Sequence, residues 1–233
     1  MVFIHDGPEA LRVGIVAASG LDVTRASTEI EARIETVLSE RAHDLGDDED
    51  AFRRDVRDVF RNGRYKPTGR GKPASEYLLR AAKEGRFPRV NAAVDVCNYL
   101  SLKTLCPISV WDADRAGTYV FRFRLGLEGE RYVFNEGGQE IELTDLIVGC
   151  ACANTDDQGL PVVNAIKDSQ STKTTGDTRR VVAAIYAPAA ESPVQKLSES
   201  CAEFAHLLSD PAIGGRAVHG ILLPGQRASF GEG

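Results

Sequence analysis

Apolar positions recur at helical spacing in the first half of the chain and gather into short runs in the second half. Apolar side chains three or four residues apart indicate amphipathic helices. Ser27 and Ser75 precede two such patterns as N-cap residues, and Ser192–Pro193 precedes another. Helices are predicted over residues 28–45, 49–62, 76–85 and 90–104, with a last helix beginning at Ser192–Pro193 and ending at Pro211.

Short apolar runs bounded by turn residues predict strands. These runs cover residues 13–18, 108–111, 119–125, 131–135, 140–143, 146–153, 160–166, 179–187 and 217–223. The run 179–187 is almost continuously apolar, which is typical of a central strand buried on both faces. The run 217–223 is predicted as an edge strand. Helices early, strands late and one closing helix predict a single α+β domain over residues 1–233, with a layered sheet core flanked by helices.

Composition narrows the class of protein. The chain has 233 residues, of which 42% are hydrophobic and 27% charged, as in globular domains. The net charge of −6 argues against a general electrostatic binder of nucleic acid, and we expect no DNA partner. Basic residues nevertheless concentrate between residues 61 and 89. No apolar run approaches the ~20 residues of a membrane span and the N-terminus lacks a signal-peptide pattern, so we expect a cytoplasmic protein with no membrane partner.

The cysteines and histidines predict no metal site and no covalent nucleophile. Five cysteines are an odd number and lie in apolar runs, which favours buried free thiols. Cys150 and Cys152 would share one face of a strand without accompanying ligands. None of the four histidines neighbours a Cys or Ser in a recognisable elbow. Gly69 and Gly71 lack the context of a phosphate-binding loop, so no cofactor is expected.

One predicted helix carries an unusual polar face. Asn91, Asp95 and Asn98 fall at i, i+4 and i+7, which places three short polar side chains together. Asn and Asp are poor helix formers because their side chains compete for nearby backbone groups. Their presence indicates a polar surface facing a cleft, or polar groups that hold an adjacent loop. They are also compatible with satisfied buried polar groups in the fold interior.

The loop of residues 167–178 is dense in hydroxyl groups and lies between two predicted core strands. It reads as a solvated hairpin loop or as a second wall of the same cleft. In the second interpretation the loop borders the same cleft as Asn91, Asp95 and Asn98.

The middle of the chain carries Val-Asp-Val-Cys-Asn-Tyr at residues 94–99, followed by Pro107 and Asp112. In this motif it resembles the B3/B4 domain of the phenylalanyl-tRNA synthetase β subunit. The resemblance continues through residues 134–143 to Thr178-Arg-Arg-Val-Val, and covers residues 62–187. The chain is similar to free-standing members of this family, with an N-terminal helical extension over residues 1–61 and a C-terminal helix and tail over residues 192–233.

The resemblance implies an activity. In the synthetase this domain hydrolyses tyrosine wrongly esterified to the phenylalanine tRNA. A free-standing member would therefore hydrolyse mischarged aminoacyl-tRNA esters in trans, and it is not a tRNA ligase. The alternative is a non-catalytic module that binds an amino acid or a tRNA 3′ end. Two positions favour this alternative, because the editing His and Glu of the synthetases correspond to Ser109 and Ala184.

Under the first hypothesis Asp95 and Asp168 are the catalytic candidates. The candidates for substrate binding are Asn91, Asn98, Ser109, Ser169, Gln170 and Thr178. Arg64, Arg70 and Lys72 form a local basic patch for the tRNA 3′ end. The expected partner is an aminoacyl-tRNA or a free amino acid.

Overall fold

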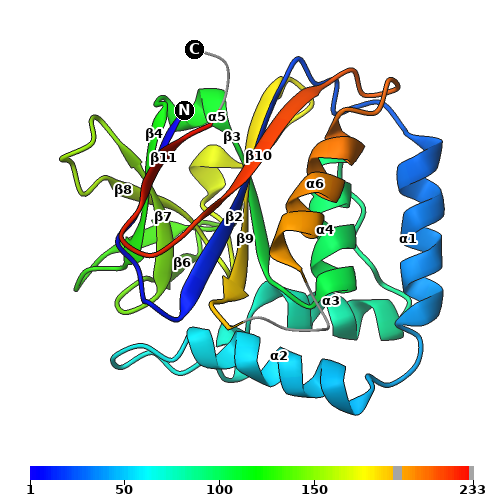
Figure 1. Cartoon of the computed structure of the whole chain (residues 1–233), viewed down its shortest axis with the longest axis horizontal. Helices are drawn as coiled ribbons and strands as arrows, with labels where there is room; N and C mark the ends of the chain where they lie inside the picture. Colours follow the sequence, from blue (N-terminus) through cyan, green and yellow to red (C-terminus); the bar gives the residue numbers. More distant parts are fainter. Residues whose placement is uncertain (191–195, 231–233) are drawn as a thin grey trace.

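The computed structural model describes residues 1–190 and 196–230, and arranges them as two facing sheets with helices over the outer face of one (Figure 1). The sheet beneath the helices is antiparallel, with strand order β10-β2-β9-β3. Its strands are β2 (Leu11–Ser19), β3 (Ile108–Asp112), β9 (Arg180–Pro188) and β10 (Arg216–Leu222). The central position of β9 and the edge position of β10 confirm both sequence predictions.

The second sheet has five strands in the order β11-β1-β4-β7-β8. They are β1 (Val2–His5), β4 (Val120–Leu125), β7 (Ile147–Cys152), β8 (Leu160–Asn164) and β11 (Arg227–Ser229). A separate hairpin pairs β5 (Arg131–Val133) with β6 (Glu140–Glu142). Strands β1 and β11 were not predicted from the sequence, because each is too short to show the alternation of apolar and polar residues.

Aromatic side chains join the two sheets. Trp111 of β3 meets Phe121 of β4 edge-on at 5.3 Å between ring centroids, and Phe123 of β4 meets Tyr186 of β9 at 6.2 Å. Trp111, Phe121, Phe123 and Tyr186 are fully buried. The core therefore lies between the sheets as well as beneath the helices.

The long helices are α1 (Thr28–Glu40), α2 (Asp47–Val59), α3 (Ala74–Lys83), α4 (Ala92–Thr104) and α6 (Leu197–Leu208). Helices α6 and α4 lie next to the four-stranded sheet (Figure 1). Gly14 in β2 permits this close approach, because a Cβ atom there would lie 2.5 Å from the Sγ atom of Cys201 in α6. All five cysteines are free and buried, and the mixed α+β class is confirmed.

Several predicted helix boundaries differ from the observed ones, since the helix predicted over residues 49–62 is α2 at Asp47–Val59 and the one predicted from residue 90 begins at Ala92. Helix α1 ends at Glu40 rather than at residue 45, because the periodic Leu45 packs against the core from the loop that follows. Helix α3 begins at Ala74 with Pro73 before it, so Ser75 is a residue inside the helix and not its cap. The predicted start at Ser192–Pro193 lies outside the described residues, and α6 begins at Leu197.

A short helix escaped prediction. Helix α5 (Ala113–Ala116) begins directly after β3, and Asp112 caps it by accepting hydrogen bonds from the backbone N–H groups of Asp114 and Arg115 at 2.9 Å each. Across residues 1–190 and 196–230, no helix combines the length and the apolar character needed to cross a lipid bilayer.

Candidate functional site

Asn91 joins helix α4 to the loop of residues 167–178. Its Oδ1 atom accepts a hydrogen bond from the backbone N–H of Val94 at 3.1 Å and caps the helix. Its Nδ2 atom donates to the hydroxyl of Thr174 at 3.0 Å. The polar helix face and the hydroxyl-rich loop are therefore neighbours.

Asp95 and Asn98 hold the segment that leads into α4. The Asp95 carboxylate accepts from the backbone N–H of Val90 at 2.8 Å and from Nε of Arg89 at 2.9 Å. Asn98 donates from Nδ2 to the carbonyl of Pro88 at 3.3 Å. Asp95 is only 7% exposed, so these bonds compensate for the cost of burying its charge. The polar face thus holds an adjacent loop, which was one of the interpretations left open by the sequence.

The same face also borders a pocket, here called the α4 pocket, of about 520 Å³. Asn91 and Asp95 line it together with residues 174–176 of the hydroxyl-rich loop and the start of α1. The loop therefore does form a second wall beside Asn91 and Asp95. Asn98 is not part of this lining.

A second pocket, here called the loop pocket, has a volume of about 540 Å³. Gln170, Lys173 and Arg115 line it, and Val90, Thr174 and Thr175 line both pockets. Val90 is 65% exposed although it is apolar. The two pockets are thus separated by a wall whose position depends on the Asp95 and Asn91 hydrogen bonds.

Gln170 carries an unmet hydrogen-bonding group. Its Oε1 atom is buried and has no hydrogen-bond partner among the described residues. Such an acceptor is costly to bury unless a ligand or water donates to it. The nearby cations are already oriented: Lys173 donates from Nζ to the carbonyl of Phe134 at 2.7 Å, and Arg115 donates from Nε to the carbonyl of Ser171 at 2.9 Å.

Asp168 belongs to this loop and lies in a cluster of polar groups. Its Oδ1 atom is 3.4 Å from the backbone nitrogen of Asn164, and it is also hydrogen-bonded to Ser109 and to the backbone of Val110. Burial raises the pKa of Asp168 to about 7, against the lowering effect of these hydrogen bonds. Asp168 therefore titrates near neutral pH.

Ser109 is fully buried within this cluster. Its hydroxyl donates to the carbonyl of Asn164 at 2.8 Å and lies 3.3 Å from the hydroxyl of Tyr186. Ser109 also pairs directly with Ala184 across β3 and β9. The two positions at which the resemblance departs from the editing synthetases are thus neighbours in the sheet, and both are closed to solvent.

Ser169 and Thr178 shape the two ends of the loop. Ser169 accepts a hydrogen bond from the backbone N–H of Ser171 at 3.3 Å and caps a short 3₁₀ turn, Gln170–Thr172. Thr178 donates to the Oδ2 atom of Asp112 at 2.6 Å. Both are buried, so their hydroxyls orient the loop.

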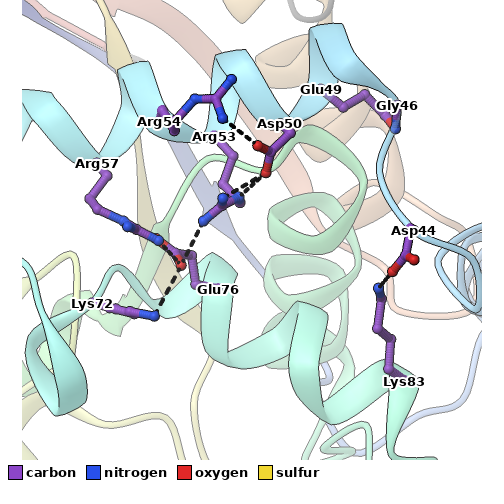
Figure 2. Close-up of polar contacts among 10 residues, drawn as sticks. All are labelled: Asp44, Gly46, Glu49, Asp50, Arg53, Arg54, Arg57, Lys72, Glu76 and Lys83. Carbon is purple, nitrogen blue, oxygen red and sulfur yellow. Dashed lines mark hydrogen bonds and ion pairs between the residues drawn. The ribbon is translucent and has the colours of Figure 1, made fainter.

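The predicted basic patch is spread around the start of α3. Lys72 lies 3.9 Å from Glu76, which also binds Arg53 at 3.1 Å and Arg57 at 2.6 Å (Figure 2). Arg64 is exposed on the surface, 3.6 Å from Glu128. Burial and the neighbouring Arg70 guanidinium lower the pKa of Lys167, which places Arg70 beside the loop of residues 167–178. Of the three predicted cations, Arg70 is therefore the one next to the candidate site.

Two further residues organise the site and were missed from the sequence. Asn164 ends β8 and accepts hydrogen bonds from the backbone N–H groups of Ile166 and Lys167 at 2.7 and 2.8 Å, while its Nδ2 atom donates to Tyr132 at 2.7 Å. An Asn at the end of an apolar run was a usable signal. Arg89 had none, because its role depends on Asp95 and on Glu31 of the distant α1. In the described residues, no cluster of three or more His, Cys, Asp or Glu side chains could hold a metal ion.

Comparisons with known proteins identify one family, and solved structures are also similar to the chain. The sequence model of the family described as the B3/4 domain matches residues 66–201. A solved structure, an N-terminal fragment of the phenylalanyl-tRNA synthetase beta-subunit from Pyrococcus horikoshii, is similar with 13% identity and a TM-score of 0.41. The alignment covers 88% of this chain and 46% of that one, so the chain spans less than half of that fragment. None of the curated proteins compared with the chain matches it.

Proposed function

Because this chain belongs to the B3/4 domain family, we propose that it binds the aminoacyl end of a tRNA and hydrolyses the ester of a wrongly attached amino acid. The observation that carries this proposal is the loop pocket, where the buried Oε1 atom of Gln170 has no partner among the described residues and Lys173 supplies a cation. Asp168, whose pKa burial raises to about 7, belongs to the same loop. A general base is most effective when its pKa lies near the working pH.

The chemistry needs few groups, because an aminoacyl ester is already activated. Asp168 accepts a proton from a water molecule as the water oxygen attacks the ester carbonyl carbon. The bond from that carbon to the terminal ribose oxygen then breaks, and the ribose oxygen takes up the proton. The products are a free amino acid and an uncharged tRNA, with no covalent enzyme intermediate.

The loop pocket offers partners for the two polar ends of the substrate. The buried Oε1 atom of Gln170 can accept a hydrogen bond from the α-ammonium group. The ammonium group of Lys173 supplies positive charge for the carbonyl oxygen as it becomes an oxyanion. Both side chains belong to the segment that Ser169 and Thr178 orient.

The polar face of α4 supports this arrangement from behind. Asp95 holds Val90, and Asn91 holds Thr174, so the two residues set the wall between the α4 pocket and the loop pocket. Asn98 holds the Pro88 carbonyl and Ser109 holds the Asn164 carbonyl, so these two side chains act through a neighbouring residue and do not touch the substrate. We therefore assign a positioning role to Asp95, Asn91, Asn98 and Ser109.

Arg64, Arg70 and Lys72 would contact tRNA phosphates at the rim of the site. Arg70 is the best placed of the three to contact a phosphate, because it is exposed and adjoins Lys167 of the loop. Lys72 is partly neutralised by Glu76. A local patch of this size gives a modest, salt-dependent affinity for RNA, consistent with the net charge of −6.

The test is a deacylation assay with correctly and incorrectly charged tRNAs. The wild-type protein should hydrolyse at least one mischarged species, and Asp168→Asn should reduce that rate on the order of 10²-fold. The rate should rise with pH and level off above a midpoint near the Asp168 pKa of about 7. Asp177→Asn is a matched control, because Asp177 is an exposed carboxylate of the same loop. Equal rates in the two variants would contradict the catalytic role of Asp168.

A second candidate function is a binding module without chemistry. The pairing of buried Ser109 with buried Ala184 favours it, because neither position offers an acid or a base to a substrate. In that case no charged tRNA loses its ester, yet an amino acid or an aminoacyl-tRNA raises the melting temperature. Gln170→Leu should then abolish that stabilisation, since it removes the unmet acceptor.

A further inference from the structure

A third pocket opens at the end of the molecule that holds the start of β1 and the end of β11, far from α2 (Figure 1). Its volume is about 390 Å³, within the range of roughly 300–1,000 Å³ typical of small-ligand pockets. Ala17, Ala18 and Ala217 contribute short side chains from the paired strands β2 and β10. The space above those strands is therefore open to a flat group. We call it the arginine pocket.

Two aromatic rings border this space. Tyr119 lines the arginine pocket and is 56% exposed, which is unusual for an aromatic side chain with no ligand to cover it. Phe230 directly follows strand β11, and its ring occupies the room left by Gly220 of β10, since a Cβ atom there would lie 2.1 Å from the ring. The rings present an apolar π-surface to the pocket.

Arg180 is fixed in place and already neutralised. Its Nη1 atom donates to the Tyr119 hydroxyl at 2.9 Å, its Nη2 atom donates to Asp114, and its guanidinium lies 5.5 Å from the centre of the Tyr119 ring. Asp114 and Tyr119 raise the pKa of Arg180, so it stays charged. Arg180 therefore stiffens Tyr119 and supplies a second flat surface for stacking.

Arg216 is the uncompensated charge of the pocket. It lines the pocket, it is exposed, and among the described residues it has neither a salt bridge nor a side-chain hydrogen bond. One free guanidinium beside an aromatic surface is suited to a planar group that bears a single anionic substituent. The hydroxyls of Ser19 and Tyr119 add polar contacts at the edge.

We propose that the arginine pocket binds a nucleoside monophosphate unit, with the base stacked on Tyr119 and the phosphate bound by Arg216. The two sources of such a unit are a free nucleotide and a residue of a single-stranded RNA. Helix α5 lies between this pocket and the candidate site. Its Asp114 binds Arg180 of the arginine pocket, and the next residue, Arg115, lines the loop pocket. The proposal does not require hydrolysis and stands apart from the proposed function.

The experiment measures binding of AMP, adenosine and the trinucleotide rCrCrA to the full chain by calorimetry. Arg216→Gln should weaken AMP on the order of tenfold and leave adenosine unchanged, because only the phosphate contact is lost. Tyr119→Leu should weaken AMP and adenosine alike, on the order of tenfold, because it removes the stacking surface. Arg54→Gln is the matched control, since Arg54 is an exposed arginine on α2 at the far end of the molecule.

The outcomes separate the sources. Binding of AMP at least as strong as that of rCrCrA identifies a free nucleotide, and binding of rCrCrA alone identifies an RNA strand. In both cases the two pocket variants must weaken binding and the control must not. Absence of binding by all three probes, or equal affinity in wild type and both pocket variants, overturns the proposal. Circular dichroism checks that each variant is folded. Ester hydrolysis should be unchanged in the pocket variants, so that a loss of nucleotide binding is distinguished from a failure of the proposed function.

Discussion

Asp95 and Asp168 are the two carboxylates that the sequence marks as catalytic candidates, and they differ in the charge that faces them. Asp95 accepts hydrogen bonds from the Arg89 guanidinium and from the backbone of Val90. Asp168 is hydrogen-bonded to the neutral Ser109 side chain and to the backbone of Asn164 and Val110, and no cation forms a salt bridge with it among the described residues. The first carboxylate is paired with a cation, and the second has no salt bridge among the described residues, with Lys173 as its more distant cation.

This difference separates an anchor from a titrating group. An opposite charge in direct contact stabilises the ionised carboxylate, whereas desolvation without a counter-charge favours the protonated form. The pKa of Asp168 is accordingly raised to about 7. Asp168 is therefore the candidate for proton transfer, and Asp95 holds the wall of the pockets through its hydrogen bond to Val90.

The largest effect is expected from breaking the anchor. Asp95→Ala removes the charge partner of Arg89 and leaves the Val90 N–H without an acceptor, which should lower the free energy of unfolding by about 3 kcal/mol. Urea denaturation measures this change. Asp177→Ala, which alters an exposed aspartate, is the control and should change stability by less than about 0.5 kcal/mol. An Asp95 variant as stable as that control would refute the anchoring role.

Asp168→Asn should raise the free energy of unfolding at high pH, whereas Asp95→Ala lowers it. The folded-state pKa of about 7 exceeds the ordinary value of 3.8, so the folded protein keeps a proton that the unfolded chain releases. The stability contributed by the neutral carboxyl group is full below pH 3.8 and is lost as pH rises through 7. The Asp168→Asn variant does not lose this stability as pH rises, because its side-chain amide does not ionise.

Relative to wild type, Asp168→Asn should therefore gain on the order of 2 kcal/mol between about pH 4 and about pH 8. Denaturation curves across that range test the prediction. Parallel pH profiles for wild type and Asp168→Asn would remove the distinction between the two aspartates.

A smaller effect is expected from Asn98→Ala. It removes one neutral hydrogen bond of 3.3 Å to the Pro88 carbonyl and leaves the Asp95 contacts in place. The free energy of unfolding should fall by about 1 kcal/mol. A thermal melt measures this stability change. Faster hydrogen exchange at the Val90 amide in the variant would show that Asn98 and Asp95 act together on this segment, and unchanged exchange would show that Asp95 holds Val90 alone.

The smallest effect is expected from Glu31→Gln. Glu31 pairs with Arg89 from α1, but both side chains are about two-fifths exposed, at 44% and 39%. An exposed ion pair contributes about 0.5 kcal/mol, and salt should screen it. A loss as large as that of Asp95→Ala would show that Arg89 is held by Glu31 and that Asp95 is secondary. Chemical denaturation at low and high salt distinguishes the two cases.

Local patterns were sufficient for several parts of the fold. The apolar run around β9 marked the central strand, because burial on both faces excludes polar residues. The predicted spacing placed Asp95 and Asn98 on one face of α4, because helical geometry alone sets that relation, whereas Asn91 precedes the helix as its N-cap with an extended backbone. Where the predicted boundaries differed, as at Leu45 and Ser75, a tertiary contact or a nearby proline outweighed the local signal.

The sequence by itself therefore determined the fold class, the central strand, the polar face of α4 and the resemblance to the B3/4 family, which depend on local periodicity and motif order. Only the tertiary structure decided which charges meet. Asp95 of α4 and Glu31 of α1 both bind Arg89, Ser109 pairs with Ala184, and Arg216 lines the arginine pocket together with Tyr119 and Phe230. Solvation and pairing of an ionisable group depend on residues distant in the chain, and no local pattern records them.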